Sequence, residues 1–203
     1  MEKTIYINQR IPLRTIDLAL RAVMNGEYSY GFALELAQGD FGGANRQKKA
    51  ATIIGKLTER NPLLPFLKEH HAETMQALAY DHDRALIIAA LINAAFQFGY
   101  DSTWLLGKYF HVQDEVSYNL ISNKLAEQYG SNRRLYVGLG AILPMYTEAG
   151  FIIHPRNGYY AKKALELKTQ LSVEYYKQSF FLNNPLKNPS EDWFDHPYFE
   201  FLQ

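Results

Sequence analysis

The chain contains no cysteine among its 203 residues. Disulfide bonds, iron–sulfur clusters and cysteine-based zinc sites are therefore excluded, and the composition fits a reducing compartment such as the cytoplasm. The sequence also lacks net charge, because 21 Lys and Arg balance 21 Asp and Glu. A neutral chain is not steered as a whole toward a polyanion, so any affinity for nucleic acid must come from a local patch of basic residues.

Long hydrophobic runs are missing as well. The longest, residues 85–98, is about fourteen residues and contains Asn93 and Gln97, whereas a membrane-spanning helix needs about twenty apolar residues. The first residues, Met-Glu-Lys-Thr-Ile-Tyr, lack the apolar core of a signal peptide. We therefore expect a cytoplasmic protein without membrane contacts. Its 47% hydrophobic residues are enough to bury a substantial core.

Residues 1–112 show helical periodicity and no convincing strand, which predicts an N-terminal helical domain. Starts and stops marked by Pro, Asn, Gly and Ser predict helices over residues 12–24 and 29–38, one that starts near Arg46 and ends before Asn61, and others over 64–79 and 84–98. Asp101 or Ser102 is expected to cap the next helix, which contains Trp104.

Residues 116–163 show the order of elements of a winged helix-turn-helix. Helical spacing predicts one helix over residues 117–129, ended by Gly130, and a second that begins at Arg133. Residues 151–156 and 159–163 flank Asn157-Gly158, a strong signal for a hairpin with a type I′ turn. The predicted fold is mainly α, with an N-terminal helical bundle (1–112) and a winged-helix-like domain with one β-hairpin (113–203).

The second helix of this pair has weak points. Gly138 and Gly140 lower helix stability, and Pro144 inside a helix costs about 3 kcal/mol because it removes a backbone donor and clashes with the preceding turn. We expect the helix to break near Leu143, with Pro144 as the first residue of a short following turn.

Basic residues sit where a winged domain meets DNA. The second helix of such a domain enters the major groove and the hairpin, or wing, lies along the backbone. These places hold Arg133 and Arg134 on the helix, and Arg156, Lys162 and Lys163 on the wing. A second phosphate-contacting patch is predicted at Arg46, Lys48 and Lys49, after the glycine-rich connector 39–45. The alternative is a winged domain that contacts only protein, because fold alone does not fix function.

The C-terminal tail, residues 180–202, is acidic and rich in aromatic residues, unlike a free disordered end. We expect it to dock, and the main interpretation is that it completes the core of this chain. The alternative is that it engages a partner subunit or covers the basic face when DNA is absent.

Catalytic motifs are scarce. His70, His71 and Glu73 form a small cluster, but only His70 and Glu73 have the spacing of ligands on one helix face, so a solvated helix is favoured over a metal site. His82 lies between two aspartates, Asp81 and Asp83, which suits a proton relay or, as we favour, a helix cap. The connector 39–45 could cradle phosphate, yet it does not match the P-loop pattern. We predict no catalytic residue, metal or cofactor.

Two stretches carry a family resemblance: residues 26–57, with Gly26-Glu-Tyr-Ser-Tyr and Gln47-Lys-Lys-Ala-Ala-Thr-Ile-Ile-Gly-Lys-Leu, and the end of the winged segment, Tyr146-Thr-Glu-Ala-Gly-Phe-Ile. With the chain length and the helical middle, they resemble the BrxA-like proteins of bacterial BREX phage-defence systems. That resemblance implies a small helical, winged-helix-like protein that binds DNA and acts beside a methyltransferase, an ATPase and other defence proteins. It assigns no individual binding residue. Residues 116–163 also resemble winged transcription regulators more generally.

The leading hypothesis is therefore a non-enzymatic accessory protein that binds double-stranded DNA mainly through backbone electrostatics, with other defence-system proteins as further partners. The alternatives are a protein-interaction scaffold and a transcriptional regulator without a defence role. An enzyme that uses His82 with Asp81 or Asp83 would need a pocket around that triplet.

Overall fold

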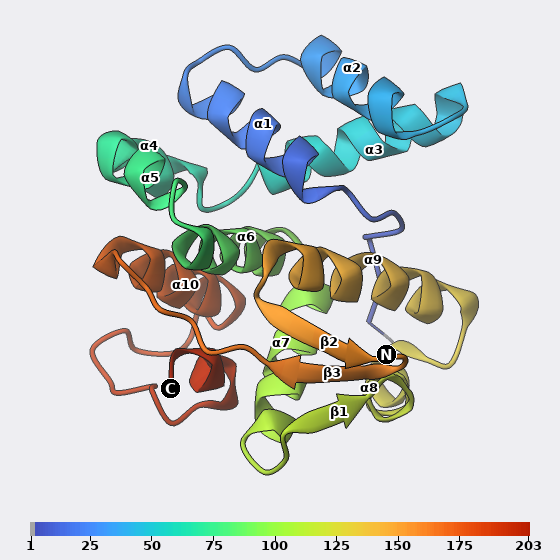
Figure 1. The fold of residues 1–203 in the computed structure, drawn as a ribbon, viewed down its shortest axis with the longest axis vertical. Coiled ribbons are helices and arrows are strands. Elements are labelled where there is room, and N and C mark those ends of the chain that lie inside the picture. Colours follow the sequence, from blue (N-terminus) through green and yellow to red (C-terminus); the bar gives the residue numbers. More distant parts are fainter. Residues whose placement is uncertain (1–2) are drawn as a thin grey trace.

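The computed structural model describes residues 3–203 and is mainly helical, with one small antiparallel sheet (Figure 1). In chain order the elements are α1 Leu13–Met24, α2 Tyr30–Asp40, α3 Ala44–Leu57, α4 Leu64–Glu69, α5 His71–Ala77, α6 Asp81–Ala95, α7 Gln97–Phe110, β1 Glu115–Ser117, α8 Tyr118–Tyr129, α9 Arg133–Ala149, β2 Ile152–Arg156, β3 Tyr159–Lys162, α10 Gln170–Asn183 and the 3₁₀ helix η1 Pro197–Leu202. The predicted fold class, mainly α with a β-hairpin, is confirmed. Within residues 3–203, no helix combines the length and the apolar character needed to cross a bilayer.

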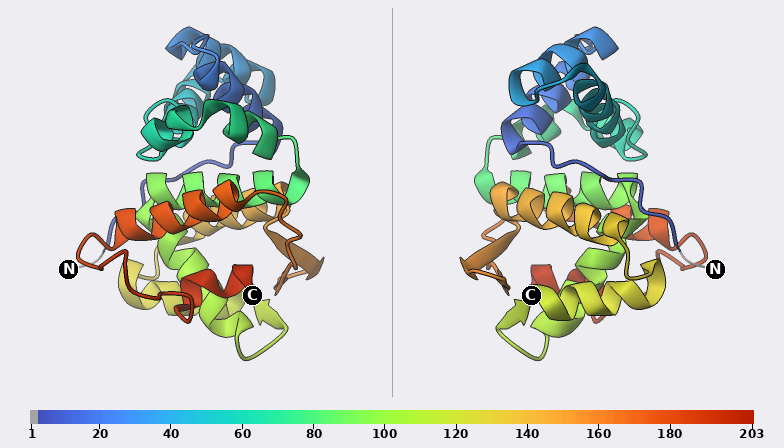
Figure 2. Two further views of the ribbon diagram at one scale, coloured as in Figure 1. Left: turned by 90° about the vertical axis from the view of Figure 1, so that its left-hand side faces the viewer. Right: turned by 90° about the vertical axis from the view of Figure 1, so that its right-hand side faces the viewer.

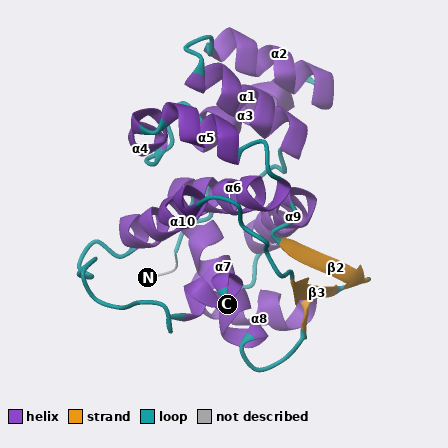
Figure 3. Ribbon diagram, turned by 60° about the vertical axis from the view of Figure 1, so that its left-hand side comes forward, coloured by secondary structure: helices purple, strands orange, loops and turns teal. Residues whose placement is uncertain are grey.

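The helices lie in layers, with α1 to α5 at the top, α6, α9 and α10 in the middle, and α7, α8 and η1 below (Figure 1). The strands lie at one edge of the molecule (Figure 3). One hydrophobic core runs through all layers, from Leu20 of α1 through Ile88 of α6 to Leu139 of α9 and Phe199 of η1. The core is thus continuous across residue 112, where the sequence suggested a domain boundary.

Short connections in the top layer follow from local signals. Ser29 Oγ accepts a hydrogen bond from the Phe32 amide and caps α2. Residues 41–43 then join α2 to α3, and Gly43 takes the positive φ of 84° that so tight a turn requires. α2 and α3 therefore form a second pair of helices joined by a short turn, apart from the winged segment.

The prediction of a single helix over residues 64–79 is wrong. The chain forms two short helices, α4 and α5, because His70 leaves the helical conformation with φ −109° and ψ 43°. The His70 ring packs edge-on against Phe66, with 5.1 Å between ring centroids. The hydroxyl of Thr74 donates to the Leu67 carbonyl at 3.1 Å and satisfies an acceptor near the break.

The boundaries of α6 and α7 also differ from the expectation. The helix expected over residues 84–98 ends at Ala95, and Phe96 is extended, with φ −138° and ψ 115°. α7 begins at Gln97, so Asp101 and Ser102 lie inside the helix and neither caps it. Gly99 lets the two helices approach closely at this corner, since a Cβ there would lie 2.9 Å from Ile92 Cγ2.

α7, β1, α8, α9, β2 and β3 follow one another in the order of a winged helix, and the strands pair in the order β1-β3-β2. Ser117 Oγ caps α8. Gly130 ends this helix with φ 74°, as the sequence predicts. β1 was not predicted, because three residues are too few to show alternation. The register of β2 and β3 shifts between Ile153 and Arg156, and the proline between them, Pro155, is tolerated because β2 is an edge strand.

The hairpin forms at Asn157-Gly158 as predicted, but its turn is not type I′. Gly158 has φ 75°, whereas no residue other than glycine in the described chain has a positive φ. A type I′ turn requires positive φ at both central residues, so the glycine alone bends the chain back here.

The expected break near Leu143 is wrong, because α9 continues to Ala149 with Pro144 inside it. Leu143, Met145 and Tyr146, which flank the proline, are all buried. Proline leaves the carbonyl of Gly140 without its usual partner, and Gly140 is exposed, so water can reach that acceptor. Tertiary packing on both sides of Pro144 outweighs its local cost.

The C-terminal tail docks onto its own chain. Tyr198, Phe199 and Phe201 are buried, and η1 packs on α7, where Gly107 leaves room for it: a Cβ at Gly107 would lie 1.9 Å from the Pro197 carbonyl oxygen. The Tyr198 hydroxyl accepts from Asn93 Nδ2 at 2.7 Å, inside a buried polar network. The main interpretation of the tail, that it completes the core, is the one the structure supports.

Candidate nucleic-acid interface

The first described residues form an extended segment, which we call the strap (residues 3–11). Its side chains alternate: Ile5, Ile7, Gln9 and Ile11 point inward and are buried or half-buried, while Thr4, Tyr6, Asn8 and Arg10 are exposed. Such a period of two is that of an extended chain with one face on the core. The strap therefore presents a row of polar and aromatic side chains to solvent.

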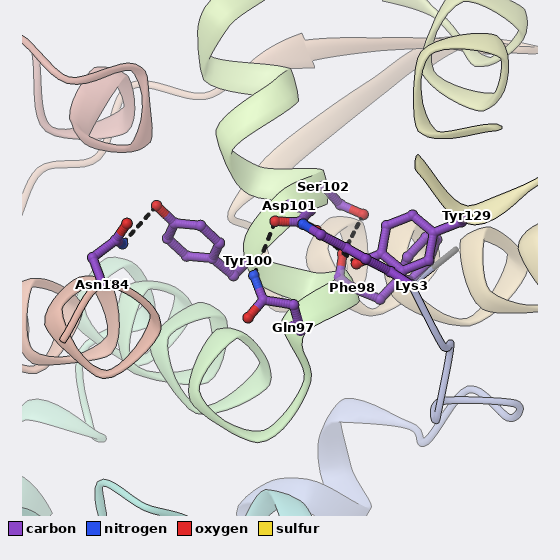
Figure 4. Close-up of polar contacts among 8 residues, drawn as sticks. All are labelled: Lys3, Gln97, Phe98, Tyr100, Asp101, Ser102, Tyr129 and Asn184. Carbon is purple, nitrogen blue, oxygen red and sulfur yellow. Dashed lines mark hydrogen bonds and ion pairs between the residues drawn. The ribbon is translucent and has the colours of Figure 1, made fainter. Parts of the chain in front are cut away.

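The start of the strap is fixed on α7 and α8. Lys3 Nζ lies 2.6 Å from Asp101 Oδ2, and the Tyr129 hydroxyl donates to the same oxygen at 2.6 Å (Figure 4). Gln97 Nε2 donates to the other carboxylate oxygen at 3.0 Å. Burial and the neighbouring Asp101 carboxylate raise the pKa of Tyr129 far above its usual range, so the phenol stays a donor. The Lys3 amide also donates to the Gln128 carbonyl at 3.1 Å.

From this anchor the strap runs alongside α9. Ile5 packs at Gly138, where an added Cβ would lie 2.9 Å from Ile5 Cγ2 and 2.8 Å from Phe98 Cε1. Further on, Arg10 donates to the Glu148 carboxylate at 2.8 Å. The glycine that weakened the predicted helix is thus the residue that lets the strap approach α9.

Three hollows lie along the strap, and Asn8 lines all three of them. The first has a wall of α3 residues, the second lies between α3, the strap and α9, and the third lies between the strap and α9. Their volumes are about 220, 510 and 630 Å³. The two larger hollows fall in the range of roughly 300–1,000 Å³ typical of ligand pockets.

We call this concave surface the basic cleft. Its cationic side chains come from α3, the strap and the start of α9: Arg46, Lys48, Lys49 and Lys56, then Arg10, then Arg133 and Arg134. Several guanidinium and ammonium groups gathered on one surface favour an anionic ligand.

Five of the eight predicted contact residues meet in the basic cleft: Arg46, Lys48, Lys49, Arg133 and Arg134. None of the five forms an ion pair with a carboxylate in the part of the chain that the structure describes. Asn132 caps α9 through its side chain, which accepts from the amides of Arg134 and Leu135. The cap stabilises the first turn of the helix, which carries the two arginines.

The three wing residues lie elsewhere. In both views of Figure 2 the β2–β3 hairpin and the start of the strap are at opposite sides of the molecule, and no residue of the hairpin lines any of the three hollows. Arg156 donates from Nη2 and Nε to the same carboxylate oxygen of Glu115 on β1, Oε2, at 2.7 and 2.9 Å. The hydrogen bonds to Glu115 raise the pKa of Arg156. The structure therefore does not bring the wing and the basic cleft onto one face.

Lys162 is paired as well, with Glu200 of η1 at 2.6 Å. Burial disfavours ionisation of Glu200, but hydrogen bonds from Lys162 and His111 outweigh it and hold the pKa of this carboxyl below its usual range. The remaining wing residue, Lys163, is half-buried beside Gly150. The acidic tail thus neutralises part of the wing within the chain itself.

The aspartates around His82 have structural roles. Asp83 is fully buried and anchors the start of α10, because it accepts from the Lys168 and Thr169 amides and from the hydroxyls of Thr169, the N-cap, and Ser172. Burial opposes its ionisation, but these four bonds lower the pKa of Asp83. His82 Nδ1 accepts from the Glu166 amide at 2.9 Å. The expected capping of α6 by Asp81 or Asp83 is wrong, since no side chain caps that helix.

Three cleft residues were missed by the sequence analysis: Tyr6, Arg10 and Lys56. The isoleucines at positions 5, 7 and 11 carried a signal for an extended segment, but it was too short to be assigned. In the described chain, no group of three His, Asp or Glu residues is placed to hold a metal ion.

No protein-family model, no curated protein and no solved structure matches the chain.

Proposed function

We propose that this protein is a non-enzymatic accessory protein that binds double-stranded DNA through the basic cleft, in a bacterial phage-defence system of the BREX type. The observation that carries the DNA-binding part is the convergence of α3, the strap and α9. A chain with zero net charge gathers the five predicted basic residues on one concave surface, and none of the five has a carboxylate partner among residues 3–203. Such a local excess of positive charge is what binding to phosphates requires.

The geometry favours contact with the DNA backbone. Lys48 and Lys49 point from α3 into one hollow, and Arg133 and Arg134 from α9 into another. Two helices with a concave surface between them suit a convex rod such as a duplex, and Lys and Arg on both sides would hold phosphates of the two strands. Binding of this kind depends steeply on salt and shows little sequence preference.

The salt dependence gives a quantitative test. If all five residues contact phosphates, the logarithm of the association constant should fall with the logarithm of the salt concentration with a slope of about −4.5. Affinity would drop about 500-fold between roughly 50 and 200 mM salt. We would measure it by fluorescence anisotropy of a labelled duplex.

Three double variants separate the surfaces. Lys48→Ala/Lys49→Ala and Arg133→Ala/Arg134→Ala should each flatten the slope to about −2.7, because each removes two phosphate contacts. Arg156→Ala/Lys163→Ala removes the same charge from the wing and should leave the slope near −4.5. If only the wing variant flattens the slope, DNA lies on the wing instead. No binding at low salt would favour the alternative of a protein-interaction scaffold.

The defence role rests on the sequence resemblance and has its own test. Copurification of the tagged protein with a DNA methyltransferase or a large ATPase from its native host would support it. Loss of phage resistance on deletion of the gene, restored by the wild type but not by Arg133→Ala/Arg134→Ala, would tie defence to the cleft. If that variant also restores resistance, the defence role does not depend on DNA binding by the cleft.

A further inference from the structure

Tyr6 is an exposed aromatic side chain in the middle of the basic cleft. It is 68% exposed and lines both the hollow with Lys48 and Lys49 and the hollow with Arg133 and Arg134. Lys56 Nζ lies 5.5 Å from the centre of its ring. The ring thus has cationic groups of two helices on its two sides, while most of its surface remains open to a ligand.

The backbone around Tyr6 is held in place. Ile7 is fully buried, and Ile5, on the other side, packs against the core at Gly138. The two ends of the strap are fixed by the Lys3–Asp101 and Arg10–Glu148 pairs. A ring on a fixed backbone loses little conformational freedom when a flat ligand stacks on it.

A base in an intact duplex cannot use such a ring, because both of its faces are covered by neighbouring bases. An unpaired base has a free face, and stacking on an aromatic side chain inside a positively charged groove is how proteins bind single-stranded nucleic acid. Cations on both sides of the ring match the phosphates on both sides of a base.

We propose that Tyr6 is a stacking platform for an unpaired nucleobase, and that the cleft prefers DNA with an unpaired stretch over an intact duplex. The phosphates on one side of the base lie against Lys48 and Lys49, and those on the other side lie against Arg133 and Arg134. This inference rests on the proposed function, of which it specifies the preferred DNA structure.

The test uses oligonucleotides of equal length: an intact duplex, a duplex with a short single-stranded gap, and a single-stranded RNA. Anisotropy at one moderate salt concentration gives each affinity. Wild type should bind the gapped duplex about 5- to 150-fold more tightly than the intact one, as expected for one stacked base.

Variants identify the ring as the cause. Tyr6→Ala should abolish the preference for the gapped over the intact duplex, whereas Tyr6→Phe should keep this preference because it keeps the ring. Tyr30→Ala is the matched control, since Tyr30 is 53% exposed on α2 and lines none of the three hollows. It should behave as wild type.

Equal affinity of wild type for gapped and intact DNA would overturn the inference, as would a preference that survives in Tyr6→Ala. If RNA binds more tightly than the intact duplex by the same factor as gapped DNA does, and this factor is lost in Tyr6→Ala, an unpaired base is supported as the ligand, whichever sugar carries it. If RNA binds more tightly than the intact duplex but gapped DNA does not, the assignment to DNA is overturned. If the cleft variants flatten the salt slope of the intact duplex but the gap does not raise the affinity, only this inference fails. If no nucleic acid binds, the proposed function fails too.

Discussion

Replacing Asp83 with asparagine should weaken the packing of α10 on α6. The carboxylate accepts four hydrogen bonds in a fully buried position, three at Oδ1 and one at Oδ2. All four donors belong to Lys168, Thr169 and Ser172, which lead into α10 or lie in its first turn. Asp83 is thus the residue through which α6 holds the start of the last helix.

The loss of stability in Asp83→Asn can be estimated from the hydrogen-bond donors that face the side chain. In Asp83→Asn the amide oxygen can keep the three bonds at Oδ1, but the NH₂ group then faces the Lys168 amide, so two donors oppose each other. A buried donor without a partner costs about 1–3 kcal/mol. The lost negative charge at a helix start adds about 0.3–2 kcal/mol. We expect a loss of about 3 kcal/mol in the free energy of unfolding, or about 6–12 °C in melting temperature for a chain of this size.

Urea unfolding at several pH values tests this reasoning. Because the pKa of Asp83 is lower in the folded protein than in the unfolded chain, its contribution is fully present above the unfolded pKa of about 3.9. It is lost as the pH falls through the lower folded pKa. The difference between wild type and Asp83→Asn should therefore be full at pH 7 and shrink below about pH 4.

The matched control is Asp81→Asn, two residues earlier in the same helix. The Asp81 side chain is 82% exposed and, among residues 3–203, pairs with Arg84 alone, so the substitution should have little effect. If Asp83→Asn is as stable as Asp81→Asn at pH 7, the role of Asp83 in anchoring the start of α10 is refuted. A difference that persists undiminished well below pH 4 would refute the electrostatic part of the argument.

The tail offers three further tests. Gly107→Ala places a Cβ 1.9 Å from the Pro197 carbonyl oxygen, so η1 should detach and limited proteolysis should cut residues 185–196 faster; unchanged cleavage would contradict this. Tyr198→Phe removes a hydroxyl that Asn93 and Ser179 use and should cost about 1–3 kcal/mol in urea unfolding. Burial and nearby Lys187 lower the pKa of His196 to about 4. The unfolded chain takes up this proton first, so wild-type stability should fall as pH drops from about 6.5 to about 4, and less so in His196→Asn.

Local signals in the sequence were enough for much of the fold. Caps such as Ser29 and Ser117, the glycine at 130, and Asn157-Gly158 act over a few residues, so their effect can be read directly from neighbouring positions. Predictions failed where distant residues decide. Pro144 stays inside α9 because buried side chains flank it, and Asp101 lies inside α7, where it binds Lys3, 98 residues away.

The candidate site shows the same limit. Charge alone marked Arg46, Lys48 and Lys49 as one group and Arg133 with Arg134 as another, but nothing in the sequence says that they share a surface. The strap joins them, and its path depends on long-range contacts such as Ile5 at Gly138. The carboxylates that pair with the wing, Glu115 and Glu200, are likewise distant in sequence from their partners.

The order of elements suggested that wing and helix would act together, yet the electrostatics of this chain separate them. On the wing, two of three cations already have carboxylate partners, and a phosphate would have to displace Glu115 or Glu200 to bind there. In the basic cleft no such competition exists for Arg133 or Lys48 among the described residues, so the same phosphate contact gains more there. Salt confines the attraction of the cleft to about one Debye length, roughly 8 Å at physiological salt, and a chain with zero net charge is not steered as a whole toward DNA. Under the proposed function, the protein would therefore capture DNA only at short range, which suits an accessory that partner proteins deliver to its site.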